Sequence, residues 1–491
     1  MPLIPLQIPP GVYRNGTDLQ STGRWRDASL VRWTDGTMQP VGGWLTRVTL
    51  TDQPLRGAIA WRDLSGDRWI AAGSYEGLFV VKANNSTYDI TPGTFNVGAK
   101  DAAVNIGFGG GLYGTAAYGL PRPDTGSYGT ATTWSLDNWG QNLVACSSED
   151  GRLLEWSLNT ASDAVAITNA PTGCSGLVVT NERFLFALGA GGNYRKVQWS
   201  DREDNTTWTP DVVNEAGDIE LQTSGQIMLG IRTRGQTLIL TDQDAHTATY
   251  QGPPFVYGFE RVGSSCGVVS RLGAASVDAG VFWMGPRGFH VYAGGAVANM
   301  PCDVADYVFG NINRTQISKV AAVTSARFSE IWWFYPSNQS LENDSYVVFN
   351  YKENHWATGK IARASGVDGG VFSTPIWMGV DGKVINHEIG HQFDDELPYA
   401  ESGPVQIGAG DNVMSATSFI PDERTQGQAT VTFKTRFHPN DTERSYGPYS
   451  MANPTDVRFT GRQVAMRVDG AYNADWRWGV PRLEAVPGGR R

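Results

Sequence analysis

The sequence predicts a mainly β protein with a β-propeller-like core of about six to eight blades and an additional C-terminal antiparallel β domain. Two observations carry this prediction. Turns containing Gly or Asn recur along the chain, each followed by a short alternating run of aliphatic and aromatic residues, which is typical of hairpin strands. Helical periodicity, by contrast, nowhere extends beyond about three turns. A series of β-sandwiches would share both features and stays open as an alternative.

The recurring unit is clearest at seven places. Successive copies lie roughly 30 to 90 residues apart, and the widest gap contains a further strand-like run at 346–351. Each unit therefore has room for about three or four strands, the content of one propeller blade. The seven runs are 76–81, 110–113, 149–156, 181–186, 234–240, 285–292 and 380–385.

Composition excludes several classes of function. The 491 residues carry a formal net charge of −10 and only 18% are charged, so the chain lacks the clustered Lys and Arg of a tight nucleic-acid binder. No apolar run approaches the length of a transmembrane helix. The apolar start, residues 1–10, has no basic residues and is broken by prolines, so we expect no signal peptide.

Four widely spaced cysteines, Cys146, Cys174, Cys266 and Cys302, predict buried free thiols.

Local composition divides the chain into three parts. Residues 1–55 are predicted to be an irregular docking segment, because three Trp in a short stretch rich in Pro and Gly need a surface to cover them. Residues 56–395 hold the recurring strands of the propeller-like domain. Residues 396–491 are predicted to form a separate antiparallel sheet domain with long loops at 421–428 and 439–454. The three N-terminal indoles are those of Trp25, Trp33 and Trp44.

The C-terminal part contains one-sided amphipathic strands. Apolar and polar residues alternate there with a period of two, which places the apolar ones on one face of a sheet. The residues expected on the buried face are Val431, Phe433, Thr435, Phe437, Val457, Phe459, Val464, Met466, Val468, Trp476 and Trp478.

One catalytic motif matches letter for letter. His387-Glu388-Ile389-Gly390-His391 is H-E-x-x-H, which on a helix holds Zn²⁺ between two imidazoles while the Glu activates water. The residues before it, however, predict a hairpin with an Asp381-Gly382 turn, and Gly390 disfavours a helix. The later positions of the longer zinc motif fall on Asp394 and Leu397, and nothing marks Glu401 or Glu423 as a third ligand. We therefore expect a strand and turn without zinc, whose His and Glu face solvent or a neighbouring subunit.

Other candidate sites are weaker. The glycine run 107–111 lacks the Lys and the helix of a phosphate loop, and the glycines of 285–289 read as a turn. The acidic cluster 394–396 lacks the spacing of a calcium loop. Two carboxylates near two Trp raise the possibility of a glycoside hydrolase, a combination that occurs by chance in so acidic and Trp-rich a chain. These four residues are Asp201, Asp204, Trp199 and Trp208. We accordingly predict no catalytic residue, no cofactor-binding residue and no metal ligand.

Several segments resemble one family of virion proteins. They resemble the tail hub or nozzle proteins of short-tailed bacteriophages, also called packaged-DNA stabilisation proteins. Each motif is short, but together they are scattered over most of the chain. The segments are 23–33 (GRWRDASLVRW), 40–44 (PVGGW), 197–201 (VQWSD), 207–210 (TWTP), 216–218 (AGD), 285–292, 475–483 (DWRWGVPRL) and 488–491 (GGRR).

This resemblance implies a non-enzymatic structural protein of the virion tail. It implies a propeller-bearing subunit, six per tail, in a homo-oligomeric ring below the portal and its adaptor protein, with a tail fibre or tailspike protein as a further neighbour. The ring would line the channel through which DNA passes without sequence-specific binding, and it would assemble in the cytoplasm of the bacterial host. The alternatives are a receptor-binding or carbohydrate-binding tail component on a propeller scaffold and, third, a zinc hydrolase.

Overall fold

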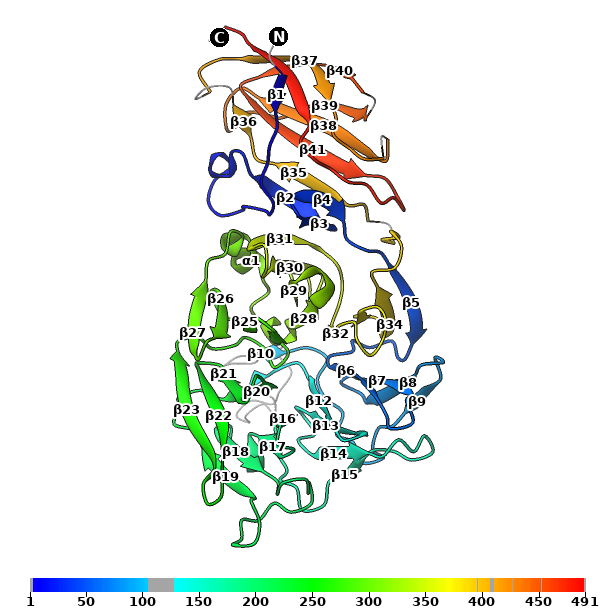
Figure 1. Ribbon diagram of the computed structural model, residues 1–491, viewed down its shortest axis with the longest axis vertical. Coiled ribbons are helices and arrows are strands. Elements are labelled where there is room, and N and C mark those ends of the chain that lie inside the picture. The colour runs from blue at the N-terminus through cyan, green and yellow to red at the C-terminus, as the bar shows by residue number, and fades with distance from the viewer. Residues whose placement is uncertain are drawn as a thin grey trace, which may run out of the picture.

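The computed structural model describes residues 3–104, 128–394, 396–406, 410–425, 427–451 and 453–489. The described chain is almost entirely β and forms two bodies, a propeller and a β-sandwich, joined into one elongated molecule (Figure 1). The predicted fold class is therefore confirmed. No helix in the described part of the chain is both long and apolar enough to cross a membrane.

The propeller has seven blades, within the predicted range, and each blade is a four-stranded antiparallel sheet. The first strands of the blades, β6, β12, β16, β20, β24, β28 and β32, contact one another in this order, and the last contacts the first. The ring is thus closed around an axis that these strands surround.

The blades follow one another in chain order. Blades 1 to 3 are β6–β9 (Ala58–Arg62, Arg68–Gly73, Leu78–Lys82, Thr87–Asp89), β12–β15 (Trp134–Trp139, Asn142–Ser147, Leu153–Trp156, Val165–Ala166) and β16–β19 (Gly176–Val179, Leu185–Leu188, Lys196–Trp199, Gly217–Glu220). Blades 4 to 6 are β20–β23 (Ile227–Arg232, Thr237–Thr241, Asp244–Gly252, Val256–Ser264), β24–β27 (Ala274–Val277, Gly280–Met284, Phe289–Ala293, Ala296–Met300) and β28–β31 (Ala321–Ser325, Glu330–Tyr335, Ser345–Asn350, His355–Lys360).

Blade 7 takes its strands from two distant parts of the chain. Three of them, β32–β34 (Ser365–Val367, Ile376–Met378, Lys383–His387), follow blade 6, and the outermost is β5 (Trp44–Thr49) from the N-terminal segment. β5 runs antiparallel to β34, with Trp44 opposite His387 and Thr49 opposite Lys383. The ring therefore closes only when the N-terminal segment supplies its last strand.

Short elements connect the blades. A two-residue hairpin, β10 (Ala103–Val104) with β11 (Tyr128–Gly129), lies between blades 1 and 2, and helix α1 (Ala305–Asn311) lies between blades 5 and 6. Single 3₁₀ turns complete the helical content: η1 (Asp18–Ser21), η2 (Ala190–Gly192), η3 (Ile317–Lys319) and η4 (Ala326–Phe328).

The sandwich combines both ends of the chain. One sheet has the order β1-β42-β37-β40, and the other has the order β2-β35-β41-β38-β39, with β36 also paired to β41. The N-terminal strands are β1 (Leu3–Pro5) and β2 (Trp25–Ser29), and a separate hairpin, β3 (Val31–Thr34) with β4 (Thr37–Pro40), follows them. The C-terminal strands are β35–β42 (Tyr399–Ser402, Val405–Gln406, Met414–Ile420, Ala429–Arg436, Arg444–Ser450, Thr455–Gly461, Gln463–Gly470, Arg482–Pro487).

Residues 1–55 differ from the irregular segment that the sequence predicts. Five strands, β1 to β5, lie there, and each pairs with a partner or forms the β3–β4 hairpin. Local patterning does not reveal them because β1 and β2 are completed by strands at least 370 positions away, as the pairing of Ser29 with Tyr399 illustrates. The predicted loop 439–454 likewise contains a strand, β39.

The alternating patterns of the C-terminal part are mostly confirmed. Buried and less buried residues alternate along β38, β40 and β41. Arg436 departs from the pattern, because it is buried at the end of β38 and donates to Gln463. Trp476 and Trp478 are buried as expected, but they lie outside regular strands, in the segment that leads to β42.

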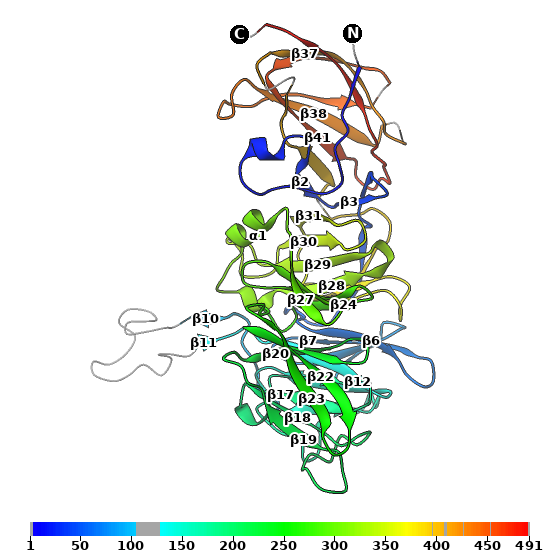
Figure 2. The ribbon, with the colours of Figure 1, turned by 60° about the vertical axis from the view of Figure 1, so that its left-hand side comes forward.

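The sandwich packs against the rim of the propeller. Figures 1 and 2 show it beyond β31, the outer strand of blade 6, with blades 2 and 3 at the opposite end of the molecule. β2 of the sandwich contacts β31 directly. The faces of the propeller at either end of its axis are therefore not covered by the sandwich.

Candidate functional site: the joint between propeller and sandwich

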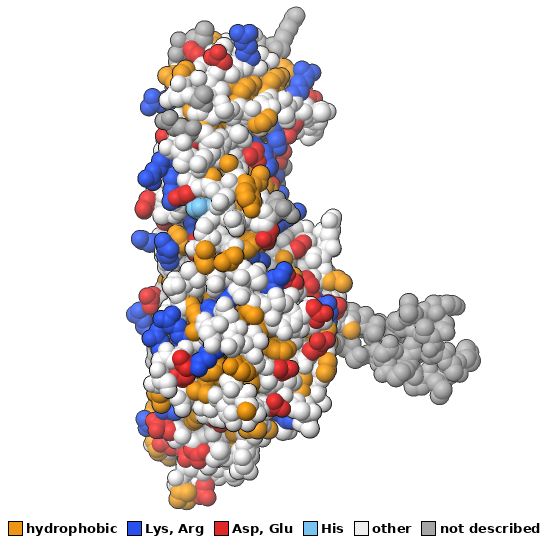
Figure 3. All heavy atoms as spheres, turned by 90° about the vertical axis from the view of Figure 1, so that its right-hand side faces the viewer, with side chains coloured by type: hydrophobic (Ala, Val, Ile, Leu, Met, Phe, Trp, Pro, Cys, Tyr) orange, Lys and Arg blue, Asp and Glu red, His pale blue; other side chains and the backbone are white. Residues whose placement is uncertain are grey.

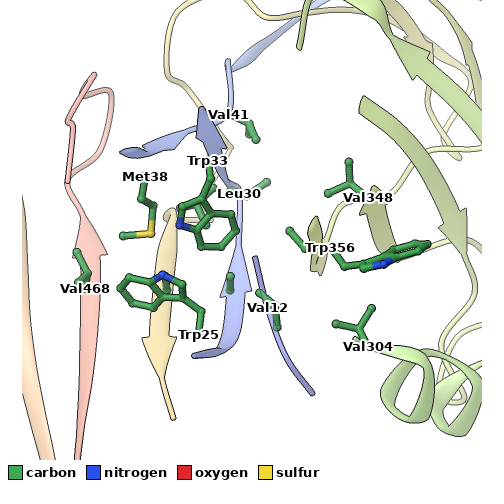
Figure 4. Packing of buried hydrophobic residues seen from close by; sticks show 14 of the residues in the cluster. Val12, Trp25, Leu30, Trp33, Met38, Val41, Val304, Val348, Trp356 and Val468 are labelled. Carbon is green, nitrogen blue, oxygen red and sulfur yellow. The ribbon is translucent and has the colours of Figure 1, made fainter. Parts of the chain in front are cut away.

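A continuous apolar core crosses the joint (Figure 4). Trp25 and Trp33, whose ring centroids lie 6.2 Å apart, pack between Val468 of the sandwich and Trp356 of blade 6. Both N-terminal indoles are almost fully buried. Burying roughly 200 Å² of an indole contributes several kcal/mol at about 25 cal/mol per Å². The joint is therefore a hydrophobic core rather than a flexible linker.

Backbone hydrogen bonds fix the register of the joint. The Val12 N–H donates to the Trp356 carbonyl oxygen over 2.7 Å, and the Leu30 N–H donates to the Tyr346 hydroxyl over 2.8 Å. Met38 and Trp478 exchange two backbone hydrogen bonds, of 3.1 and 2.9 Å. The N-terminal segment is thus tied to the propeller and to the C-terminal segment at once.

A buried ion triad lies beside the apolar core. Arg32 of β3 donates two hydrogen bonds to Glu330 of blade 6, both 3.0 Å, and two to Glu388 after blade 7, of 2.9 and 2.7 Å. Side-chain exposure is only 3% for Arg32, 4% for Glu330 and 10% for Glu388. Burial alone would lower the pKa of Arg32, but the two carboxylates raise it. Arg32 therefore stays charged and holds two blades to the N-terminal hairpin.

The H-E-x-x-H segment is part of this joint. As predicted, it is a strand end and a turn: β34 ends at His387, and Gly390 has a φ of +61°. The Gly43 N–H donates to the Gly390 carbonyl oxygen over 2.8 Å, and the Ile389 N–H donates to the Gly43 carbonyl oxygen over 3.0 Å. The segment is a docking turn for residues 42–44.

Two glycines explain how closely the chains approach there. A Cβ on Gly42 would lie 2.5 Å from the Glu388 Cα, and a Cβ on Gly43 would lie 2.5 Å from the Gln392 backbone nitrogen. Both distances are far below contact, so only glycine fits. The Gly-Gly pair before Trp44 is thus a packing requirement of the joint.

His387 and Glu388 do not face solvent or a neighbouring subunit, and that expectation is wrong. Arg363 Nε donates to His387 Nε2 over 2.9 Å, and the His387 ring stacks on Trp377 with a centroid distance of 3.9 Å. Burial, with Arg363 beside it, lowers the pKa of His387 well below its usual value. His387 is therefore neutral, and its Nε2 lone pair is already engaged by Arg363.

The second histidine of the motif lies in a different setting. His391 is partly exposed, and its Nε2 lies 3.9 Å from a carboxylate oxygen of Asp475. Asp394 accepts a hydrogen bond from the Trp44 indole N–H over 2.8 Å, so it too serves the joint. Within the described residues, no group of three or more His, Cys, Asp or Glu is placed to hold a metal ion.

The paired carboxylates near Trp lie in a tightly hydrogen-bonded loop. Asp204 accepts hydrogen bonds from the hydroxyls of Thr206 and Thr207, and those from Thr206 are the main cause of its lowered pKa. Trp199 and Trp208 are both buried. The loop therefore holds Asp204 in local hydrogen bonds and offers neither of these two indoles as an open aromatic platform.

The other predictions concern two glycine-rich segments, the acidic cluster 394–396 and the cysteines. The glycine run 107–111 and Asp395 lie outside the described residues. Residues 285–289 form the expected turn, between β25 and β26. All four cysteines are free, and burial is the main reason that the pKa values of Cys174 and Cys302 rise to about 12.

Charge is distributed unevenly along the molecule. Residues 134–220, which form blades 2 and 3, contain 13 Asp and Glu but 5 Lys and Arg, a formal charge of −8. Residues 396–491 contain 11 of each and are formally neutral. The lower end of the propeller in Figure 3 accordingly shows acidic side chains, beside apolar ones. The molecule is thus acidic at the end remote from the sandwich.

An apolar loop tip lies at this acidic end. Val212 and Val213, between β18 and β19, are 97% and 85% exposed. The tip is nevertheless ordered by hydrogen bonds, because Asn214 Nδ2 donates to the Thr209 carbonyl oxygen over 3.0 Å and Asn214 Oδ1 accepts from the Asp211 N–H over 3.1 Å. The two valines are thus held in an exposed position by the hydrogen bonds of the loop.

Comparison with known proteins assigns no family to this chain. No family model matches the chain, and no curated protein matches it by sequence. Similar solved structures include virginiamycin B lyase from Staphylococcus aureus, which is 8% identical with a TM-score of 0.42 over 69% of this chain and 97% of that chain. The CNH domain of AfRom2 is 12% identical, with a TM-score of 0.34 over 55% of this chain and 89% of that chain.

A third similar structure is PorZ, a bacterial surface component of the type-IX secretion system of Porphyromonas gingivalis. It is 10% identical, with a TM-score of 0.38 over 85% of this chain and 46% of that chain. At these identities and TM-scores the likeness carries no activity, substrate or partner to this chain.

Sequence reasoning missed the residues that build the joint. Arg32 lies 298 positions from Glu330 and 356 from Glu388, so no local pattern connects them. The sequence did indicate that the Trp-rich N-terminal segment must bury its indoles against another part of the protein. Trp25 and Trp33 are covered by the C-terminal sandwich and the propeller together, whereas Trp44 belongs to blade 7.

Proposed function

We propose that this chain is a non-enzymatic subunit of the tail nozzle or hub ring of a short-tailed bacteriophage. In this role it lines the channel through which DNA leaves the particle, and it retains the packaged DNA until release. Its partners are further copies of itself, six to a ring, the portal-adaptor protein above and a tail fibre or tailspike protein. The protein acts in the virion tail after assembly in the host cytoplasm.

The observation that carries the proposal is the meeting of the two chain ends. Among the segments that resemble the nozzle family, those near the two termini, 23–33, 40–44 and 475–483, meet at the joint. The hairpin that carries Trp33 pairs through Met38 with Trp478. A joint that fixes the propeller relative to the sandwich suits a ring subunit, because closure requires the same geometry in every copy.

The charge distribution supports the same role. Residues 134–220, which form blades 2 and 3, carry a formal charge of −8, and such an excess of negative charge repels a passing phosphate backbone at distances up to about the Debye length, roughly 8 Å at physiological salt. A conduit needs this property because DNA must slide without sticking. The neutral sandwich end and the exposed valine tip leave other surfaces for protein contacts.

One observation favours the alternative, a glycan-binding tail component. Two hollows of about 690 and 400 Å³ share Asp242 on one face of blades 3 to 5. The larger hollow has a mixed polar and apolar lining that includes Phe289 and Met300, whereas the smaller one has a mainly polar lining at which Tyr194 is exposed. Polar side chains beside an exposed aromatic ring, as in the smaller hollow, suit hydroxyl-rich ligands. Glycan-array binding that Tyr194→Ala abolishes would favour this role over the nozzle.

Stoichiometry in purified virions tests the proposed function. Quantitative peptide mass spectrometry with isotope-labelled standards would count this chain against the portal protein of the same particles. We expect six copies per tail. Three copies, as in a trimeric spike, or the absence of the chain from intact particles would contradict the nozzle role.

A further inference from the structure

The β-sandwich contains an apolar cavity between its two sheets. The volume of this cavity is about 280 Å³. One sheet lines it with Met414 of β37 and with Leu483 and Ala485 of β42. The opposing sheet lines it with Phe433 of β38 and Met466 of β41. All five side chains are buried, so the cavity lies inside the body that the two chain ends form together.

The cavity has its mouth at one edge of the sandwich. Ile4, Leu6 and Ile8 alternate with exposed residues, and all three line the cavity while they stay only partly buried. Gln406 of β36, which is also partly buried, places an amide group at the same mouth. Within the described chain, β1 and β36 are edge strands of the two opposing sheets. A ligand can therefore enter between these two edges.

Water is a poor occupant for this cavity. A buried water needs two to four polar partners. Among the described lining residues only Ser402 and Gln406 have polar side chains, and Ser402 Oγ already accepts a hydrogen bond from the Met466 N–H over 2.9 Å. An engineered cavity of roughly 150 Å³ lined by Leu, Ile and Phe stays dry and binds benzene. The cavity here is larger, and leaving it empty lowers the stability of the fold.

We propose that this cavity binds the hydrocarbon chain of a small neutral amphiphile, with the polar end of the ligand at Gln406. The interior of the cavity offers apolar contacts, and its two unbranched methionines, Met414 and Met466, adapt to the shape of a flexible chain. The Gln406 amide can donate to and accept from a hydroxyl or amide group. No Lys, Arg, Asp or Glu is among the described lining residues, so a neutral head fits better than a charged one. This site does not depend on the proposed tail function.

Calorimetric titration of the full-length protein with 1-octanol tests the proposal. We expect one molecule to bind per chain, with a negative change in heat capacity because apolar surface is buried. The matched probe is 1,8-octanediol, which has the same chain length but would have to bury a second hydroxyl without a partner. It should bind at least about tenfold more weakly. A wild-type chain that does not bind 1-octanol, or that binds both probes equally, would overturn the proposal.

Two variants separate the cavity from general stickiness of the surface. Ala485→Phe fills part of the cavity and should weaken 1-octanol binding about tenfold, the cost of leaving about two methylene groups in water. The control is Thr460→Phe, which adds the same ring at an exposed position of β40 in the same sheet and should bind as wild type does. Undiminished binding by Ala485→Phe, or equal losses in both variants, would contradict the assigned site.

Methionine-methyl NMR of the wild-type protein covers the case in which Ala485→Phe does not fold. 1-Octanol should shift the methyl signals of Met414 and Met466, with the same Kd that calorimetry gives. The signals of Met228 in β20 and Met284 in β25, both in the propeller, should stay unchanged. Met414→Leu and Met466→Leu, which nearly conserve volume, assign the two signals. Shifts confined to propeller methionines, or no shift at all, would overturn the inference.

Discussion

At the scale of residues, we expect Arg32 to contribute strongly to stability because it neutralises two buried carboxylates. Arg32→Ala would leave Glu330 and Glu388 buried without a counter-charge, so we expect a loss of about 3–5 kcal/mol in the free energy of unfolding. The control is Arg24→Ala, which removes the partly exposed ion pair with Asp303 and should cost about 1 kcal/mol or less. Urea denaturation measures both. Equal losses for the two variants would contradict the account.

Buried histidines should make the protein sensitive to mild acid. Burial lowers the pKa values of His290 and His355, and lowers that of His387 further. Below about pH 6.5 the unfolded chain binds protons at these positions while folded His387 stays neutral, so stability present above that pH falls as the pH falls. His387→Gln should reduce this loss by about 1.4 kcal/mol per pH unit.

Urea titrations between pH 7 and 5 measure this slope for wild type and His387→Gln. The glutamine oxygen can still accept the hydrogen bond from Arg363, so the variant should fold. Wild-type stability that is constant over this range, or an identical slope in the variant, would show that His387 does not titrate as described.

The H-E-x-x-H match illustrates what sequence can and cannot predict about a residue. The Asp381-Gly382 turn before the motif was sufficient to predict a strand and turn there. The partners of the motif were not predictable, because Arg32 and Gly43 come from the other end of the chain. Local sequence fixes backbone conformation through turn chemistry, whereas the pairing of Glu388 with Arg32 depends on the complete ring.

At the scale of elements, β5 closes the propeller, and Gly43 lets it do so. Gly43→Ala should destabilise the protein strongly, because the new Cβ would meet the backbone of Gln392 and displace β5 from β34. The matched control is Gly310→Ala in α1, where a Cβ meets nothing and the helix should gain up to about 1 kcal/mol. Melting temperatures of the two variants check this contrast. A Gly43→Ala protein as stable as wild type would contradict the role of β5.

Elements with local partners were predictable, and elements with distant partners were not. The runs at 76–81, 234–240 and 380–385 correspond to β8, β21 and β34, which pair with neighbouring strands of the same blade. β1 and β2 escaped prediction because each is an edge strand that pairs with the far end of the chain. A strand that needs a remote partner carries little local signal.

At the scale of the whole molecule, propeller and sandwich should unfold together. The apolar core is continuous across the joint, and the N-terminal segment supplies strands to both bodies. We expect a single calorimetric transition for the intact chain. Removal of residues 1–50 should abolish it, because the sandwich loses β1 and β2 and blade 7 loses β5. Two resolved transitions in the intact chain, or wild-type melting of the truncated one, would contradict this.

The central claim concerns assembly, and a reconstruction of the intact virion tail tests it most directly. The account predicts six copies of this chain in a closed ring around the DNA channel, below the portal and its adaptor, with a channel wall that is acidic or neutral. Three copies in a fibre at the periphery of the tail, or a channel wall dominated by Lys and Arg, would contradict it.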